Sequence, residues 1–339
     1  MDLRPSDEQQ QLIDAFGALY AKESSPERVR DAEPSGFDRR LWDLLVEMGS
    51  VSMAVAEANG GWGASTLDLA LVAEQHGYAL GSAPLIETQV AARLLEQLGP
   101  GCADALAAAL AGERLVTIAL HPARNGTASL VPAGAVADDV LVRVGEDLVL
   151  AELGAGRITP ENLGSMPLAD VDVSGGRVVA SGADATALCE GALDDWLVLT
   201  ANALVGIARR SLGIGVEYVK ERRAFGQPIG AFQAIAHRLA DSAAATDGAQ
   251  LLARQAAWAA AEEPYRFPEL AAMAFGFAAE TARDASYRAL HFHGGYGFMV
   301  EYDIQLYFRR ARAWANVGMD PMRAYRRVAD RRYGPIRSG

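Results

Sequence analysis

Residues 221–233 read Glu221-Arg-Arg-Ala-Phe-Gly-Gln-Pro-Ile-Gly-Ala-Phe-Gln233, and this segment separates two long helical patterns. Pro228 prevents the first helix from continuing, and two glycines permit a tight turn. Arg222 lies at this corner beside an aromatic residue and just before a new helix, where it is well placed to bind a phosphate. The alternative is a plain helix–turn–helix corner whose charges are solvated. The segment predicts a helical C-terminal region with a candidate anion site.

Apolar residues that recur every three or four positions predict long helices on both sides of this corner. The expected ranges are 192–220, 232–261, 268–292, 302–316 and 321–332. The first 112 residues show the same spacing, and Ser6 with Gln9 forms a capping-box pattern at the first helix.

Between these helical regions the pattern changes to short β-branched runs, typical of antiparallel strands. The runs are 115–120, 140–144, 148–150 and 177–180. The fold class predicted is therefore mainly α with a small central β domain. The predicted domains are a helical N-terminal domain (1–112), a β middle domain (113–190) and a helical-bundle C-terminal domain (191–339).

Composition narrows the functional classes. The formal net charge is −12 and the pI is about 5.0, so the chain has no overall positive field for nucleic acid or an anionic membrane. Lys22 and Lys220 are the only lysines among 31 basic residues, so a cationic site would be made of arginine. Two distant cysteines, no leader-like segment and no long apolar run predict a cytoplasmic protein without a disulfide framework or membrane insertion.

A second glycine-rich stretch, His291-Phe-His-Gly-Gly-Tyr-Gly-Phe298, follows the third long helix. Its glycines would let a ligand approach the backbone closely, although a simple helix stop explains them equally well. His291 and His293 are two positions apart on a helix end and do not face each other, so a metal pair is not expected. The sequence contains no GxGxxG after a strand, no GxxxxGK(S/T), no GxSxG and no HExxH motif. Nicotinamide-binding folds, P-loop enzymes and common hydrolases are therefore not supported.

Taken together, these segments resemble the acyl-CoA dehydrogenase family along nearly the whole chain. The motifs that carry the resemblance are Glu221-Arg-Arg-Ala-Phe-Gly226 with Pro228 and Phe232-Gln233, Leu239-Ala-Asp241, and Gly294-Gly-Tyr-Gly297 followed by Glu301 and Arg309. The resemblance implies a helical N-domain, a β-barrel-like middle domain and a four-helix-bundle C-domain. It also implies FAD-dependent α,β-dehydrogenation of an acyl-CoA thioester.

The resemblance implies roles for six residues. Arg222, Phe225 and Gln233 would hold the FAD pyrophosphate across a subunit interface. Gly294 and Gly295 would approach the adenosine half of the cofactor. His291 stands where a glutamine usually precedes this glycine pair by three positions.

The sequence departs from the family pattern at the catalytic base. The usual position for the glutamate falls in Asn316-Val-Gly-Met-Asp320, and an alternative position falls in Asp194-Asp-Trp-Leu197. Neither position holds a glutamate, and the usual flavin-loop motifs of the β domain are also missing. Asp320 and Asp195 are weak replacement candidates, because both positions also suit ordinary helix caps.

The resemblance is therefore to the base-less subunit of heteromeric actinobacterial acyl-CoA dehydrogenases, which act in fatty acid or steroid side-chain β-oxidation. It implies a homo- or hetero-tetramer with a paralogous subunit, an acyl-CoA substrate and electron-transfer flavoprotein as acceptor. The alternatives are a self-sufficient enzyme that uses Asp320 or Asp195, and a non-enzymatic scaffold. No metal is expected.

Overall fold

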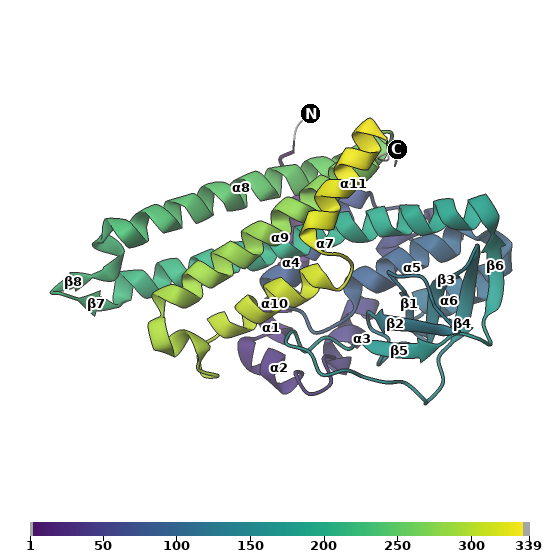
Figure 1. The fold of residues 1–339 in the computed structure, drawn as a ribbon, viewed down its shortest axis with the longest axis horizontal. Helices are drawn as coiled ribbons and strands as arrows, with labels where there is room; N and C mark the ends of the chain where they lie inside the picture. The colour runs from purple at the N-terminus through teal and green to yellow at the C-terminus, as the bar shows by residue number, and fades with distance from the viewer. Residues whose placement is uncertain (1–2, 335–339) are drawn as a thin grey trace, which may run out of the picture. The chain divides into compact units, whose positions relative to one another are not determined.

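The computed structural model describes residues 3–334 and is mostly helical with small β-sheets (Figure 1). The helices are α1 (Asp7–Glu23), α2 (Pro26–Asp31), α3 (Arg39–Glu47), α4 (Thr66–Tyr78), α5 (Leu85–Gln97), α6 (Ala103–Leu110), α7 (Gly182–Glu221), α8 (Gln233–Glu262), α9 (Phe267–Phe292), α10 (Ile304–Asn316) and α11 (Pro321–Tyr333). The strands are β1 (Val116–Ile118), β2 (Thr127–Val131), β3 (Asp139–Val144), β4 (Asp147–Glu152), β5 (Ala169–Asp172), β6 (Arg177–Ser181), β7 (Arg223–Ala224) and β8 (Gln227–Pro228). Short 3₁₀ helices, among them η5 (Gly294–Phe298), connect some of these elements.

The chain forms two compact units that interleave in sequence. Unit 1 comprises residues up to 26, residues 70–81 and residues from 198 onward, whereas unit 2 comprises residues 27–69 and 82–197. The predicted division into three domains at 112 and 190 stays a prediction. The outermost residues of that division, 1–2 and 335–339, lie outside the described residues.

Unit 1 is built around α9, which packs against α8, α10 and α11 (Figure 1). Its apolar face is rich in alanine and contains the fully buried Phe275. Helices α4 and α7 make backbone contact within this unit, because a Cβ atom at Gly77 would lie 1.8 Å from the Ala203 oxygen. A Cβ at Gly206 would lie 2.1 Å from the Glu74 oxygen. The two glycines therefore allow an approach that larger residues would block.

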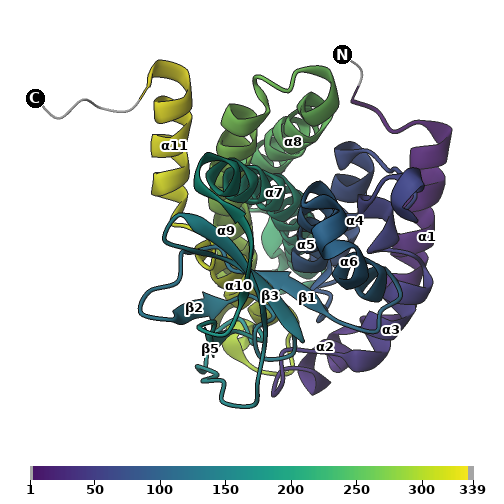
Figure 2. The same ribbon diagram turned by 90° about the vertical axis from the view of Figure 1, so that its right-hand side faces the viewer.

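Unit 2 contains the six strands β1 to β6, with α5 beside β1 (Figure 2). The four-stranded sheet has the order β1-β3-β4-β6, and β2 pairs with β5 in a separate sheet. The expectation of a barrel-like domain is wrong, because residues 3–334 contain only these open sheets and the β7–β8 hairpin. The expected antiparallel pairing holds for β3–β4 and β4–β6, but β1 and β3 are parallel, since the chain crosses over between them.

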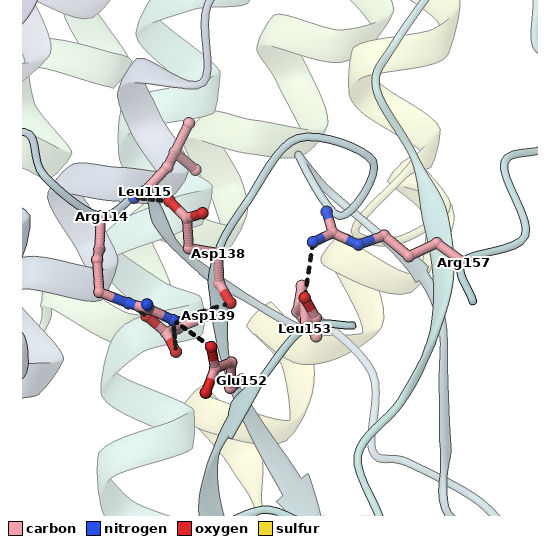
Figure 3. A network of polar contacts seen from close by, with 7 residues as sticks. All are labelled: Arg114, Leu115, Asp138, Asp139, Glu152, Leu153 and Arg157. Carbon is pink, nitrogen blue, oxygen red and sulfur yellow. Dashed lines mark hydrogen bonds and ion pairs between the residues drawn. The ribbon is translucent and has the colours of Figure 1, made fainter. Parts of the chain in front are cut away.

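An arginine fixes the start of the four-stranded sheet (Figure 3). Arg114 donates from Nε and Nη2 to the two carboxylate oxygens of Asp139 at 2.5 and 2.8 Å, and its Nη2 lies 3.5 Å from Glu152. The carboxylate of Asp139 raises the pKa of Arg114 above its ordinary value. The neighbouring Asp138 accepts a hydrogen bond from the backbone N–H of Leu115 at 2.7 Å. These contacts join the segment before β1 to the start of β3 and the end of β4.

The predicted ranges from residue 113 onward agree broadly with the structure, but they differ at the start of α7, at β2 and β5, and at the β7–β8 hairpin. Helix α7 begins at Gly182. Residues 182–190 are therefore helical, whereas the sequence predicted them to be part of the β region. Strands β2 and β5 were not predicted, because their alternating exposure gives short runs without a continuous β-branched pattern. By length and composition α7 could cross a membrane, but 72% of its most apolar window is buried inside the structure, as in a core helix of a soluble protein.

Candidate functional site

The corner predicted at residues 221–233 is a short β-hairpin between two long helices. Helix α7 ends at Glu221, and strands β7 and β8 pair Arg223 with Pro228 and Ala224 with Gln227 (Figure 1). Phe225 occupies the left-handed region at φ 53° at the tip of the hairpin, followed by Gly226 at φ 79°. The hairpin is braced at its base by a 2.8 Å hydrogen bond from the Ile229 N–H to the Arg222 oxygen.

The hairpin has polar side chains that are free to bind a ligand. The side chains of Arg222 and Gln233 are exposed, and within residues 3–334 neither has a polar partner. Gln233 is the first residue of α8, whose N-cap, Phe232, supplies no side-chain hydrogen bond to the first turn. Phe225 is 94% exposed and contacts Phe232 edge to face, with ring centroids 6.1 Å apart. A guanidinium, an amide and free helix N–H groups therefore lie on an open surface next to exposed aromatic carbon.

The second glycine-rich stretch forms η5 at the end of α9. Gly294 has φ 60°, and a Cβ atom added to Gly294 or Gly295 would meet no atom within 4 Å. His291 is exposed and lies beside Tyr287, with ring centroids 6.1 Å apart. The backbone at the glycine pair is therefore open to a molecule from outside the chain. The joint use of this stretch and the hairpin in binding one ligand stays a prediction.

His293 differs from His291 in a way that the sequence did not indicate. It is buried, its ring stacks on Tyr218 at 3.8 Å between centroids, and its Nδ1 lies 2.8 Å from the Ala289 oxygen. Burial lowers the pKa of His293 below its ordinary value. The side chain therefore packs the end of α9 against the end of α7 and is not available to a ligand.

Comparison with known proteins shows which family this chain belongs to. Residues 6–111 match the acyl-CoA dehydrogenase N-terminal domain, and residues 190–317 match the acyl-CoA dehydrogenase C-terminal domain. Acyl-CoA dehydrogenase IpdE2 of Mycobacterium tuberculosis is 31% identical, over 96% of this chain and 98% of its own. The chain belongs to the acyl-CoA dehydrogenase family. Members of this family are oxidoreductases that carry FAD.

Solved structures of acyl-CoA dehydrogenases share the fold. A chain of the ChsE4-ChsE5 complex from Mycobacterium tuberculosis has a TM-score of 0.88 and 26% identity, covering 99% of this chain and 100% of that one. The Tcur3481-Tcur3483 steroid ACAD G363A variant also has a TM-score of 0.88 and 26% identity, and the match covers 96% of this chain and 97% of that one. The name of each of these two structures joins two components, ChsE4 with ChsE5 and Tcur3481 with Tcur3483. This agrees with the resemblance to heteromeric members of the family.

The two aspartates suggested as replacement bases have structural partners. Asp320 caps α11 and accepts a 2.7 Å hydrogen bond from the Met322 N–H. Asp195 lies 3.4 Å from Nη1 of Arg93, and both side chains are about 15% exposed. Burial raises the pKa of Asp195, and the positive charge of Arg93 opposes that rise. Asp320 therefore has the cap geometry that the sequence allowed, whereas Asp195 is one half of an ion pair.

The first half of α7 contains a further polar contact that the sequence did not reveal. Trp196 is 1% exposed and donates its indole N–H to Oε1 of Glu87 on α5, 3.3 Å away. Burial raises the pKa of Glu87 above its ordinary value. At the alternative base position the chain thus has a buried indole and, beside it, Leu197, which is also buried.

A buried ionic cluster in unit 1 was also missed. Glu74 on α4 is 1% exposed and accepts hydrogen bonds from Arg209, from Gln250 at 2.8 Å and from Arg254 at 3.2 Å. The one available signal was an acidic residue between the apolar runs Leu69–Ala73 and Gly77–Leu80. Because its partners are 135 or more positions away, the sequence could not identify them.

Proposed function

We propose that this chain is the non-catalytic subunit of a heteromeric acyl-CoA dehydrogenase and completes the FAD site of a paralogous partner. The observation that carries the proposal is the combination of an intact, exposed Arg222–Gln233 corner with no glutamate at either base position. The side chains of Arg222 and Gln233 make no polar contact within residues 3–334, so they are available to a ligand held by another chain.

The residues of the hairpin fit a pyrophosphate. Arg222 offers a planar fork of N–H donors, which suits phosphate oxygens, and Gln233 adds an amide at the positive end of the α8 dipole. The exposure of these groups favours a cofactor held mainly by another chain. Phe225, at the hairpin tip, would cover the cofactor from the solvent side.

The glycine pair and His291 would contribute the second contact. The open backbone at Gly294 and Gly295 can approach the adenosine half of the cofactor without a side chain in between. The exposed imidazole of His291 would replace the usual glutamine as a polar contact. When bound, FAD accepts the hydride that leaves the β-carbon of the acyl-CoA thioester.

Proton removal from the α-carbon is assigned to the partner. A positioned general base typically contributes ~10²–10⁴-fold to the rate. In this chain Asp320 is engaged in capping and Asp195 in an ion pair, while Trp196 and Leu197 fill the alternative position. We therefore infer that the partner subunit supplies both the glutamate and the segments that wrap the flavin ring.

We further propose a substrate, an assembly, an electron acceptor and a location. The substrate is an acyl-CoA of fatty acid or steroid side-chain oxidation, and the likeness to a steroid ACAD favours the steroid. The assembly is a tetramer of two chain types, electron-transfer flavoprotein accepts the electrons, and the location is the cytoplasm.

Purification tests the proposal. The chain is expressed alone and together with a paralogue that retains the glutamate and flavin-loop motifs, and bound FAD is counted per chain. We expect a colourless, inactive chain alone and a yellow, active complex with one FAD per pair of chains. A yellow, active homomer with one FAD per chain would favour a self-sufficient enzyme, and a complex without FAD would favour a scaffold.

A further inference from the structure

A cavity in unit 2 has no role in the proposed function. Its volume is about 90 Å³, and it lies between the four-stranded sheet and the first turns of α7, with Leu94 of α5 at its side (Figure 2). It meets solvent at His121 and Pro122, which are exposed. None of the residues assigned to FAD binding lines it. We call this space the sheet cavity.

The walls of the sheet cavity are mostly aliphatic, and the strand register explains why. Ile118 of β1 pairs with Leu141 of β3, and Leu148 of β4 pairs with Arg143 of β3. Paired residues point to the same face of a sheet, as do residues two positions apart, so these four side chains share one face. The three aliphatic ones are at most 3% exposed, and Leu193 lines the cavity from α7.

One charged side chain of this cavity is free to bind a ligand. Arg143 donates from Nε to the Gly145 oxygen at 3.0 Å, which holds the guanidinium in place. Its two Nη groups have no hydrogen-bond or ion-pair partner among residues 3–334. His121 and Glu190 also line the cavity, but each already has an interaction within the chain. The sheet cavity thus combines a fixed pair of N–H donors with an apolar interior.

This combination fits a small molecule with one carboxylate and a short aliphatic chain. A planar guanidinium matches the two oxygens of a carboxylate. Aliphatic walls favour a ligand that brings carbon atoms with it over a fully hydrated anion such as phosphate. An apolar cavity of about 150 Å³ holds the six carbons of benzene, so a cavity of about 90 Å³ holds roughly four.

We propose that the sheet cavity binds a free aliphatic carboxylate of about three to five carbons. Its chain lies against Ile118, Leu141 and Leu193, and its carboxylate accepts hydrogen bonds from the Nη groups of Arg143. The proposal does not depend on the role in flavin binding, since none of these residues belongs to the hairpin or to η5.

Calorimetric titration tests the size and charge of the ligand. The full chain, with any partner that co-purifies, is titrated with butyrate, acetate and inorganic phosphate. We expect butyrate to bind about tenfold more tightly than acetate, which leaves the apolar walls without contact, and more tightly than phosphate. Equal affinity for butyrate and acetate, or no binding of butyrate, would overturn the proposal.

Variants locate the site. Arg143→Gln should weaken butyrate binding at least tenfold, and Ala192→Leu, which fills the cavity without removing a charge, should abolish it. Arg124→Gln, at an exposed arginine of unit 2, should bind butyrate as wild type does. Melting temperatures establish that the variants are folded. Wild-type affinity in folded Arg143→Gln or Ala192→Leu would contradict the site.

The thiol of Cys189 provides a second readout, because it lines the same cavity. Iodoacetate carries a carboxylate, whereas iodoacetamide is similar in size and neutral. We expect the ratio of their alkylation rates at Cys189 to be at least tenfold higher in wild type than in Arg143→Gln, and butyrate to slow the reaction with iodoacetate. The buried Cys102 is the internal control and should show neither effect. Equal ratios at Cys189 in the two proteins would argue against a carboxylate site.

Butyryl-CoA separates the sheet cavity from a substrate site. It has the same acyl chain, but its carboxyl group is a thioester and offers no pair of charged oxygens to Arg143. It should therefore not displace butyrate at equal concentration. Displacement would contradict the proposal and assign the cavity to the acyl-CoA, whereas loss of FAD or of activity in the complex would bear only on the proposed function.

Discussion

Trp196, in the first half of α7, donates its indole N–H to the carboxylate of Glu87 on α5 across 3.3 Å. Trp196 is buried, and the raised pKa of Glu87 reflects the cost of keeping a charge there. Trp196 lies at the alternative position at which the resemblance would place the base. The side chains that replace the glutamate are therefore fixed parts of the core of unit 2.

Replacement of this indole has a pH-dependent cost. Trp196→Phe keeps most of the ring volume but removes the donor to Glu87, so we expect the free energy of unfolding to fall by about 1–3 kcal/mol. The loss should be largest where Glu87 is ionised and should shrink as pH falls through its raised pKa, above the usual range of a glutamate, because a protonated carboxyl is less costly to leave unpaired. Melting temperatures from pH 4 to 7 test this, with Trp42→Phe at a buried tryptophan of α3 as control. A pH-independent loss would contradict the interpretation.

Truncation of Arg222 should weaken flavin binding by the complex. Because charge-assisted hydrogen bonds contribute about 1.5–3 kcal/mol, we expect Arg222→Ala to raise the dissociation constant of FAD about 10- to 100-fold. Arg222→Lys should recover only part of the loss, since it lacks the planar fork. Arg223→Ala, at the adjacent residue of β7, is the matched control. Flavin absorbance per chain and fluorescence titration measure the effect, and equal losses at 222 and 223 would argue against a specific contact.

Neutralisation of Glu74 should destabilise unit 1. Glu74→Gln keeps the shape of the side chain but leaves Arg209 and Arg254 without their carboxylate. Breaking a buried ion pair costs about 3–5 kcal/mol, whereas an exposed pair contributes less than about 1 kcal/mol. Denaturant unfolding should therefore show a large loss for Glu74→Gln and a small one for Glu263→Gln, which disrupts the more exposed pair with Arg266.

His76 should make the protein sensitive to acid. Its ring is 4% exposed, lies 2.9 Å from the Tyr20 hydroxyl and stacks on Trp314, and burial lowers its pKa from 6.5 to about 3. The unfolded chain takes up the proton more readily, so His76 contributes full stability above pH 6.5 and loses it as pH falls toward 3.

Melting temperatures between pH 7 and 4 measure this dependence in wild type and in His76→Gln. The variant should be less stable at pH 7 and should have a shallower decline with acid. His237→Gln, at an exposed histidine of α8, should keep the wild-type slope. An unchanged slope in His76→Gln would exclude this histidine as the source.

A methyl group at the crossing of α4 and α7 should be poorly tolerated. The added Cβ in Gly77→Ala would lie 1.8 Å from the backbone oxygen of Ala203, so the helices would have to separate. We expect a loss of about 3 kcal/mol or more, at the upper end of the cost of overpacking. Gly101→Ala, where nothing lies within 4 Å, should change stability by less than about 0.5 kcal/mol. Thermal unfolding of the two variants compares them directly.

Local patterns predicted the local structure well. The Ser6–Gln9 capping box forms, with reciprocal hydrogen bonds of 3.0 and 3.2 Å, and α8 to α11 begin and end within two residues of the predicted ranges. The family and the corner between the two helices at 221–233 could also be predicted, because both depend on short, contiguous motifs, but the pairing of β7 with β8 at this corner was not.

Features that depend on distant residues could not be predicted. The parallel pairing of β1 with β3 and the separate β2–β5 sheet are set by tertiary packing, which β-propensity does not encode. The partners of Glu74 and Trp196 lie more than 100 positions away. For the same reason the sequence could not show that Asp195 is tied to Arg93 and that His293 is buried.

The exposed hairpin at 222–233 has a genetic consequence under the proposed assembly. The side chains of Arg222 and Gln233 make no polar contact within residues 3–334, so under this assembly selection would act on them through the cofactor content of a different gene product. A null allele of this gene would present as loss of flavin from the partner. Suppressors of Arg222 substitutions should therefore arise in the partner's gene, and the two genes should be inherited together.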